Sequence, residues 1–459
     1  EATPMRWRSM QMQPVWLLTI IWIPLFLYSA RVENPLRRHG LAPGNQPLSM
    51  DNVLGIDFGG EIWLHGYTIS TTDIPADGEV QLDLYWQAQR QLGLVYGFNV
   101  RMRDQEDRLW NSSDIVRPQG WRFMPGTDFW PPDKYVLDNY ALRPLPGTPP
   151  GEYQLEVVAF RKDTLQPLHS AHLGSLQITK PDRSSFAGEL PLVLLGDEWW
   201  MLRDFRIDRM EAAPGDLIGI HAVWEGVGVV TERRNVRIRV ESLDGDYAKQ
   251  FDFDLSPSYP PGRWLPGEAL RDQYIFRMPA SIPEGEYKWR MIMLRPDGSQ
   301  VGEFVPSSTI KINVPVRRFD FPSGTERLDV TLGEIAELAG YNLDKRTVVA
   351  GDNLALTLVW SASSEIPDSY RVFVHLLDDN NELRAQSDGE PAGWARPTSG
   401  WMPGEYVSDY HNLALNQGLK PGRYSLHVGM YHPQSGQRLV SSMIPDGSIL
   451  VVKIDVLAY

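Results

Sequence analysis

Three copies of one pattern run through this sequence, and they constrain its fold more than any other feature. The first marker is a tryptophan that ends a stretch of alternating apolar residues: Trp86, Trp224 and Trp360. The second is a Pro-Gly pair at 125–126, 266–267 and 403–404. The third is a turn that leads into a tyrosine, at 150–153, 284–287 and 421–424. Alternation with a period of two is typical of strands with one buried face, so the repeat predicts three copies of a β-structured module.

Length and composition agree with this prediction. The 459 residues are enough for about three domains of ~150 residues each. With 39 glycines, 36 prolines and 11% aromatic residues, the chain suits a turn-rich, all-β protein better than a helical one. We therefore expect three tandem antiparallel β-sandwich modules, either immunoglobulin-like or jelly-roll-like, and the sequence leaves these two topologies open.

Charge and cysteine content exclude several functions. The net charge of −14 argues against nucleic acid as a partner, because phosphate binding requires a clustered basic surface. The absence of cysteine excludes disulfides, thiolate metal sites and cysteine nucleophiles. It does not fix the compartment, because modules of this size need no disulfides to be stable.

An uncharged apolar run occupies residues 15–30, with arginines on both sides. As a helix it would span ~24 Å, somewhat less than the ~30 Å hydrocarbon core of a bilayer. Trp16 and Tyr28 lie near its ends, where interfacial aromatics are common. We favour a retained transmembrane helix. A cleaved signal peptide fits less well, because Tyr28 stands where a small residue is wanted before the cleavage site, and a buried core helix is the third alternative.

The chain order follows from the apolar run, the repeats and the Pro/Gly-rich stretches between them. The predicted parts are a tail at 1–14, a transmembrane helix at 15–30, a linker at 31–51, module 1 at 52–180, a linker at 181–196, module 2 at 197–314, a linker at 315–326 and module 3 at 327–459.

The sequence contains no recognisable catalytic, cofactor or metal motif. The nine histidines show no metal-ligand spacing, and nucleophile-elbow, phosphate-loop and dinucleotide-binding patterns are absent. The acidic stretch 378–382 loosely resembles a calcium loop without the spacing of one. Acidic residues recur in the same place at 104–107 and 244–246, so hairpin turns explain all three stretches. We predict no catalytic residue, no cofactor and no metal.

Aromatic residues in irregular segments are the best candidates for ligand binding. An aspartate follows the Pro-Gly pair by five residues in modules 2 and 3 and by twelve in module 1, so 127–133 is predicted to be a seven-residue insertion. Insertions into loops are where binding functions are commonly added to a sandwich. The candidate ligand-binding residues are Trp121, Asp128, Trp130, Asp133, Tyr135, Trp264, Trp401 and Glu405. Packing of these loops over the open end of a sandwich is the more ordinary explanation.

Module 3 resembles a β-sandwich region of bacterial multi-span membrane glycosyltransferases of the mannosyltransferase-like superfamily. The residues that carry the resemblance are Gly340-Tyr341, Trp360, 370–378, Pro397-Thr398, 401–405 and 421–431. The resemblance implies a location outside the cytoplasm, after a membrane helix. In that family the catalytic acidic residues lie between early membrane helices, and nothing in this sequence matches them, so no catalytic residue is carried over.

We therefore expect a non-catalytic protein of the bacterial cytoplasmic membrane, with one span at 15–30 and extracytoplasmic modules that bind a glycan or protein or serve as a scaffold in the envelope. One alternative is the C-terminal accessory part of a membrane glycosyltransferase whose catalytic spans are absent from this chain. A second alternative is a structural subunit of a larger membrane assembly.

Overall fold

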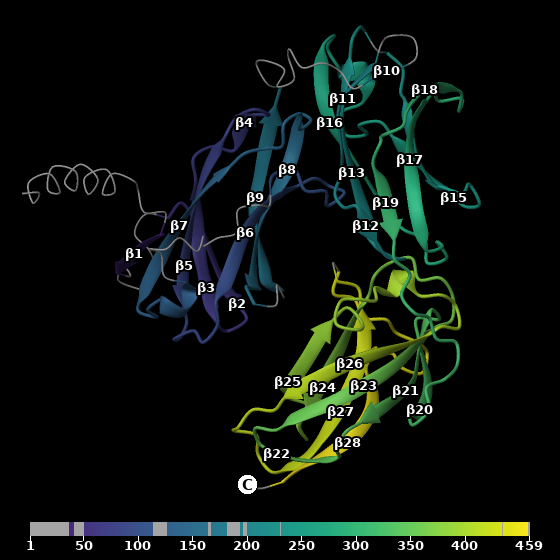
Figure 1. The fold of residues 1–459 in the computed structure, drawn as a ribbon. Coiled ribbons are helices and arrows are strands. Elements are labelled where there is room, and N and C mark those ends of the chain that lie inside the picture. Colours follow the sequence, from purple (N-terminus) through teal and green to yellow (C-terminus); the bar gives the residue numbers. More distant parts are fainter. Residues whose placement is uncertain are drawn as a thin grey trace, which may run out of the picture. The chain divides into compact units, whose positions relative to one another are not determined.

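The computed structural model describes residues 36–40, 50–112, 126–163, 167–180, 193–195, 200–229, 231–433 and 435–457. Strands dominate these residues, with three short 3-10 turns besides (Figure 1). The predicted all-β class is confirmed. The apolar run 15–30 lies outside the described residues, and within the described part no helix is long and apolar enough to cross a membrane.

The strands form six sheets, which we group as three sheet pairs in chain order. In the first pair, one sheet has the order β1 (Leu36–Gly40), β7 (Lys134–Leu142), β5 (Val80–Ala88), β3 (Ile62–Ile69), β2 (Asn52–Phe58), and the other β4 (Asp73–Pro75), β9 (Pro167–Thr179), β8 (Gly151–Arg161), β6 (Tyr96–Arg103).

The second and third sheet pairs repeat this plan. The second has β10 (Val193–Leu195), β11 (Trp200–Ile207), β13 (Leu217–Gly226), β16 (Glu268–Arg277) in one sheet, and β12 (Glu211–Ala212), β19 (Thr309–Ile312), β17 (Gly285–Leu294), β14 (Asn235–Ser242), β15 (Ala248–Asp254) in the other, with β18 (Gln300–Phe304) on β17. The third has β20 (Glu326–Leu332), β21 (Ala336–Leu343), β23 (Asn353–Ala362), β26 (Tyr406–Ala414), and β22 (Thr347–Val349), β28 (Ile449–Leu457), β27 (Gly422–Tyr431), β24 (Arg371–Leu377), β25 (Leu383–Gly389).

The strand order distinguishes between the two topologies that the sequence left open. In the third sheet pair, β21, β23 and β26 share one sheet, whereas β24, β25, β27 and β28 share the other (Figure 1). From β21 onward, without the three-residue β22, the first, second and fifth strands therefore lie in one sheet and the other four in the second sheet, and β20 is a further strand beside β21. That order is immunoglobulin-like, with the fourth strand attached to the sheet that holds the third, sixth and seventh.

Each sheet pair encloses a core of its own. The tryptophans of the repeat, Trp86, Trp224 and Trp360, are fully buried in three separate clusters of apolar side chains. The alternating apolar residues before Trp86 and Trp360 are also fully buried, which confirms the inward faces predicted from the period of two. Replacing such a tryptophan by alanine typically destabilises a protein by about 3–5 kcal/mol, so these positions anchor the fold.

The chain divides into two compact units, Glu1–Ser185 and Phe186–Tyr459. The first unit contains the first sheet pair, and the second unit contains the second and third sheet pairs together. The residue bounds predicted for the modules stay a prediction.

Candidate functional site

Three 3-10 turns place the tryptophans that the sequence singled out. The turns are η1 (Thr127–Phe129), η2 (Pro261–Arg263) and η3 (Thr398–Gly400), and each is followed directly by a tryptophan: Trp130, Trp264 and Trp401. The structural counterpart of Trp264 and Trp401 is therefore Trp130, and not Trp121, which lies outside the described residues. A Trp-x-Pro pattern at all three positions was the signal that could have revealed this equivalence.

This equivalence corrects the predicted insertion in module 1. Asp133 takes the place of Gly267 and Gly404 after the tryptophan, and the next aspartate follows at the same spacing of five residues in all three copies. The segment 127–133 is therefore no insertion. The misleading feature was Gly126, which precedes η1 as its N-cap, whereas the glycines of the other two copies follow the 3-10 turn.

The structure buries most of the candidate ligand-binding residues. Trp130, Trp264 and Trp401 are at most 5% exposed, and Tyr135 is 7% exposed. The indole N–H of Trp264 donates to Tyr259 O over 2.8 Å, so this ring is fixed by the protein itself. Packed rings present no free face, whereas Asp128 and Asp133 are partly and largely exposed, respectively. Ligand binding by these residues stays a prediction.

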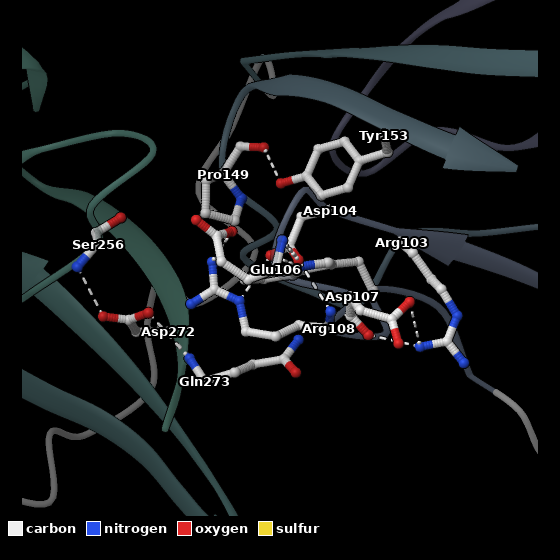
Figure 2. Close-up of polar contacts among 11 residues, drawn as sticks. Arg103, Asp104, Glu106, Asp107, Arg108, Pro149, Tyr153, Ser256, Asp272 and Gln273 are labelled. Carbon is white, nitrogen blue, oxygen red and sulfur yellow. Dashed lines mark hydrogen bonds and ion pairs between the residues drawn. The ribbon is translucent and has the colours of Figure 1, made fainter. Parts of the chain in front are cut away.

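A buried aspartate holds the loop before each of the turns η2 and η3. Asp272 on β16 accepts from Ser256 N over 2.7 Å (Figure 2), and Asp409 on β26 accepts from Ala392 N over 2.8 Å. Ser256 and Ala392 share a left-handed backbone, with φ of 46° and 55°. A carboxylate that accepts from a backbone N–H forms a strong, charge-assisted bond, which offsets part of the strain of that conformation. Asp138 on β7 is buried at the equivalent position of the first sheet pair.

The acidic hairpin turns have a structural explanation as well. Asp104 accepts from the backbone N–H groups of Glu106 and Arg108, and its second oxygen accepts from Arg108 Nε over 2.7 Å (Figure 2). The same oxygen accepts from Trp110 Nε1, also over 2.7 Å. Asp378 in the third sheet pair likewise accepts from two backbone N–H groups, of Asn380 and Glu382, and from an arginine, Arg384 Nε. Among the residues that the structure describes, no group of three or more His, Asp or Glu side chains is placed to hold a metal ion.

Glu405 lies at a junction inside the second unit, where the second and third sheet pairs meet. Its side chain is fully buried, and its two oxygens accept from two different arginines. Arg396 Nη2 donates to Oε1 over 2.6 Å, Arg317 Nη1 donates to Oε2, and Met402 N also donates to Oε2 over 3.0 Å. A buried carboxylate is tolerated when it is paired and hydrogen-bonded in this way. The structure thus gives Glu405 a role in holding the two sheet pairs together.

Arg317 belongs to the segment that connects these two sheet pairs, and it contacts both. Its Nη2 donates to Ala280 O of the second sheet pair over 2.7 Å, and its Nη1 donates to Gly400 O of the third over 3.1 Å. The carbonyl of the next residue, Arg318, accepts from Tyr406 N over 2.7 Å. A planar guanidinium with several donors is well suited to joining three acceptors at once.

Two glycines allow close backbone contact at the same junction. A Cβ at Gly400 would overlap Pro214 O, and a Cβ at Gly215 would overlap the backbone of Gly400. Ser399 Oγ donates to Gly215 O over 3.1 Å, and Arg277 Nη1 donates to the same carbonyl over 2.9 Å. The contact is therefore both tightly packed and hydrogen-bonded.

A serine, a histidine and an aspartate form a chain of hydrogen bonds beside Asp409. Ser387 Oγ lies 3.0 Å from His411 Nδ1, and His411 Nε2 lies 2.9 Å from Asp409 Oδ2. The order resembles a hydrolase triad, but His411 is only 6% exposed, and the repeat places Tyr140 and Tyr274 at its position. We assign this network to fixing Asp409, which in turn holds the loop at Ala392.

Sequence reasoning missed Trp394, an exposed tryptophan in the loop between β25 and η3. Its indole lies over the guanidinium of Arg371, and the residue is 46% exposed. A single tryptophan between Gly393 and Pro397, in a stretch too rich in Gly and Pro for a strand, was the available signal. It was overlooked because the repeat has no tryptophan at that place in the other two copies.

Comparisons with known proteins add little to these observations. No protein-family model matches the sequence, and no curated protein matches it. A solved crystal structure of a protein described as membrane anchored, from Corynebacterium diphtheriae, is 10% identical over 87% of this chain and 92% of that one, with a TM-score of 0.15. Similarity this low carries no argument about function. The resemblance to membrane glycosyltransferases has no family match and stays a prediction.

Proposed function

We propose that this chain is a non-catalytic, membrane-anchored protein of the bacterial cell envelope whose β-sandwiches lie on the extracytoplasmic side. Residues 15–30 would hold it in the cytoplasmic membrane as a single span. The sandwiches would act as a scaffold or binding module, with a glycan or a protein as partner. The length, apolarity and arginine flanks of 15–30 support the anchor.

The junction in the second unit is the observation that carries the scaffold role. Neighbouring domains in one chain usually move relative to each other unless their interface is large or well fixed. Here Arg317 binds acceptors on both sheet pairs, and Gly215 and Gly400 bring the two backbones into contact. A scaffold that holds a partner at a set distance from the membrane needs a rigid connection between its sandwiches. Two domains that act independently on a flexible linker need no such connection.

Two alternatives make different demands on the chain. As the accessory part of a membrane glycosyltransferase, the two joined sheet pairs would position a glycan for catalytic spans outside this sequence. As a structural subunit, it would only pack against neighbouring proteins. The described residues favour neither alternative over the anchored scaffold.

Purification from native membranes, followed by intact mass spectrometry and identification of partners, tests the proposal. A chain that only detergent extracts, together with a stoichiometric envelope partner, is the expected result. Extraction by alkaline carbonate alone would contradict the anchor. A much heavier polypeptide containing this sequence would favour the glycosyltransferase alternative.

A further inference from the structure

Trp394 occupies a loop whose backbone is unusually strained. Ala392, Gly393 and Trp394 are three successive residues in the left-handed region, with φ of 55°, 62° and 73°. For a residue with a side chain this conformation costs about 1–2 kcal/mol, and a bulky tryptophan adopts it rarely. Such strain persists only where the surrounding structure imposes it, and it clusters at functional sites.

The surrounding residues fix this loop. Asp409 holds the N–H of Ala392, and Trp394 N donates to Glu390 O over 3.1 Å. Gly389 leaves room for the indole, since a Cβ there would lie 3.3 Å from Trp394 Nε1. The ring is thus set in a defined position although it is 46% exposed. An exposed ring held in this way is preorganised for a partner.

Polar groups lie beside the ring on the outer face of the sheet. Arg371 Cζ is 5.0 Å from the centroid of Trp394, and Arg371 lies directly opposite Tyr431 on β27. Burial raises the pKa of Tyr431, the negative charge of Asp388 raises it further, and a hydrogen bond from Arg371 opposes both effects. Asp388 keeps 27% of its side chain exposed, and His375 Nε2 lies 3.6 Å from its carboxylate. Arg371 therefore contacts both Trp394 and Tyr431, and Asp388 lies close enough to Tyr431 to act on its charge.

The charges around Trp394 favour one class of ligand. Arg371 already occupies one face of the indole, so the ring is a poor site for a second cation. Arg371 and Asp388 carry opposite charges, so the electrostatic attraction for either an anionic or a cationic ligand is small. A pyranose ring suits the site, because its apolar C–H face packs on the open face of the indole while hydroxyls at its rim can bond to the phenol and the carboxylate nearby.

We propose that Trp394 is the stacking platform of a binding site for a neutral hexose unit of an envelope glycan, with Asp388 and Tyr431 as its hydrogen-bonding groups and Arg371 supporting the ring from its other face. This site rests on the proposed function in one respect, the exposure of the sandwiches to envelope glycans. It names the residues and the ligand class that the proposed function leaves open.

The variant Trp394→Gly distinguishes a role in ligand binding from a role in packing the loop. Glycine adopts a φ of 73° without penalty, so this substitution should preserve or strengthen the loop while removing the platform. We expect hydrogen–deuterium exchange of residues 389–397 to stay the same or slow down. If Trp394 served only to pack the loop, the same substitution would speed up exchange there.

Binding of cellohexaose, maltohexaose and α-1,6-mannohexaose to the purified full chain, measured by isothermal titration calorimetry, tests the proposal. At least one of these probes should bind the wild type, and Trp394→Gly should weaken that binding by about tenfold or more. Tyr410→Ala is the matched control, because Tyr410 is 60% exposed on the other sheet and should leave binding unchanged.

Three outcomes would overturn the site: faster exchange of residues 389–397 in Trp394→Gly, no binding of any probe at about 10 mM, or equal binding by the wild type and Trp394→Gly. The membrane anchor is tested separately, by the membrane extraction. The two proposals can therefore fail independently of each other.

Discussion

At the scale of single residues, the buried aspartates of the repeat tie loops to strands. Asp409 accepts from Ala392 N and lies 2.9 Å from His411 Nε2, so Asp409→Ala would remove the partner of the part-buried Ala392 N–H and of one ring nitrogen of the buried His411. We expect a loss of about 3 kcal/mol in local stability, and of about 1 kcal/mol for Asp409→Asn, which keeps one acceptor. Hydrogen–deuterium exchange of 386–397 measures both. Asp379→Ala, at an exposed carboxylate, is the control, and equal exchange in it and in Asp409→Ala would contradict this role.

Histidine burial predicts a pH dependence, again at the scale of residues. Burial lowers the pKa of His221 on β13, the positive charges of Arg271 and Arg206 lower it further, and Asp204 opposes them. The native state then binds fewer protons than the unfolded state. The contribution of His221 to the stability of the native state is therefore fully present above its ordinary pKa of 6.5, and it is lost as the pH falls towards the lower pKa of the native state. The opening free energy of β13, obtained from exchange rates corrected for the intrinsic rate at each pH, should fall between about pH 7 and pH 5, and His221→Gln should reduce that fall. An unchanged pH response in His221→Gln would contradict the assignment.

At the scale of elements, η3 differs from its counterpart η2 in what it touches. Gly400→Ala would drive a methyl group into Pro214 O, which we expect to weaken the junction by about 2 kcal/mol. Gly262→Ala in η2 is the matched control, because a Cβ there meets its nearest neighbour at an ordinary 3.6 Å. Limited proteolysis of the connecting segment 315–325 reports the result: faster cleavage in Gly400→Ala alone is expected. Equal cleavage rates in both variants would count against tight packing at this position.

The elements also show how far the sequence could predict the structure. Strands with one buried face carry their own signal, and the tryptophans at Trp86, Trp224 and Trp360 therefore fell on inward faces as expected. Contacts between distant residues carry no such signal. Glu405 was expected in an open loop because Arg317, its partner, stands 88 residues away. The left-handed backbone at Ala392 is held by Asp409, 17 residues away, which no local pattern reveals.

At the scale of the whole molecule, the two sheet pairs of the second unit are held together by direct contacts and not by a flexible linker alone. Its connecting segment is not a bare linker, because Arg317 bonds to the second sheet pair through Ala280 and to the third through Gly400 and Glu405. A buried ion pair adds little net stability compared with apolar packing, but losing one partner is costly, so such a pair chiefly enforces one arrangement. The absence of native cysteine allows this arrangement to be measured with two introduced labels.

Arg317→Ala should therefore release the two sheet pairs from each other without unfolding either. Spin labels at Lys249→Cys and Asp379→Cys, both exposed, would give one narrow distance distribution in the parent and a broad one in Arg317→Ala, because about 3 kcal/mol of junction stability is lost. Arg423→Ala is the matched control: Arg423 pairs with Asp455 on the surface, where an ion pair contributes about 1 kcal/mol at most. A distance distribution that stays narrow in Arg317→Ala would mean that the backbone contact between Gly215 and Gly400 alone holds the two sheet pairs in one arrangement. Broadening in both variants would mean that the second unit is flexible for reasons other than the junction, and the scaffold role would then lose its support.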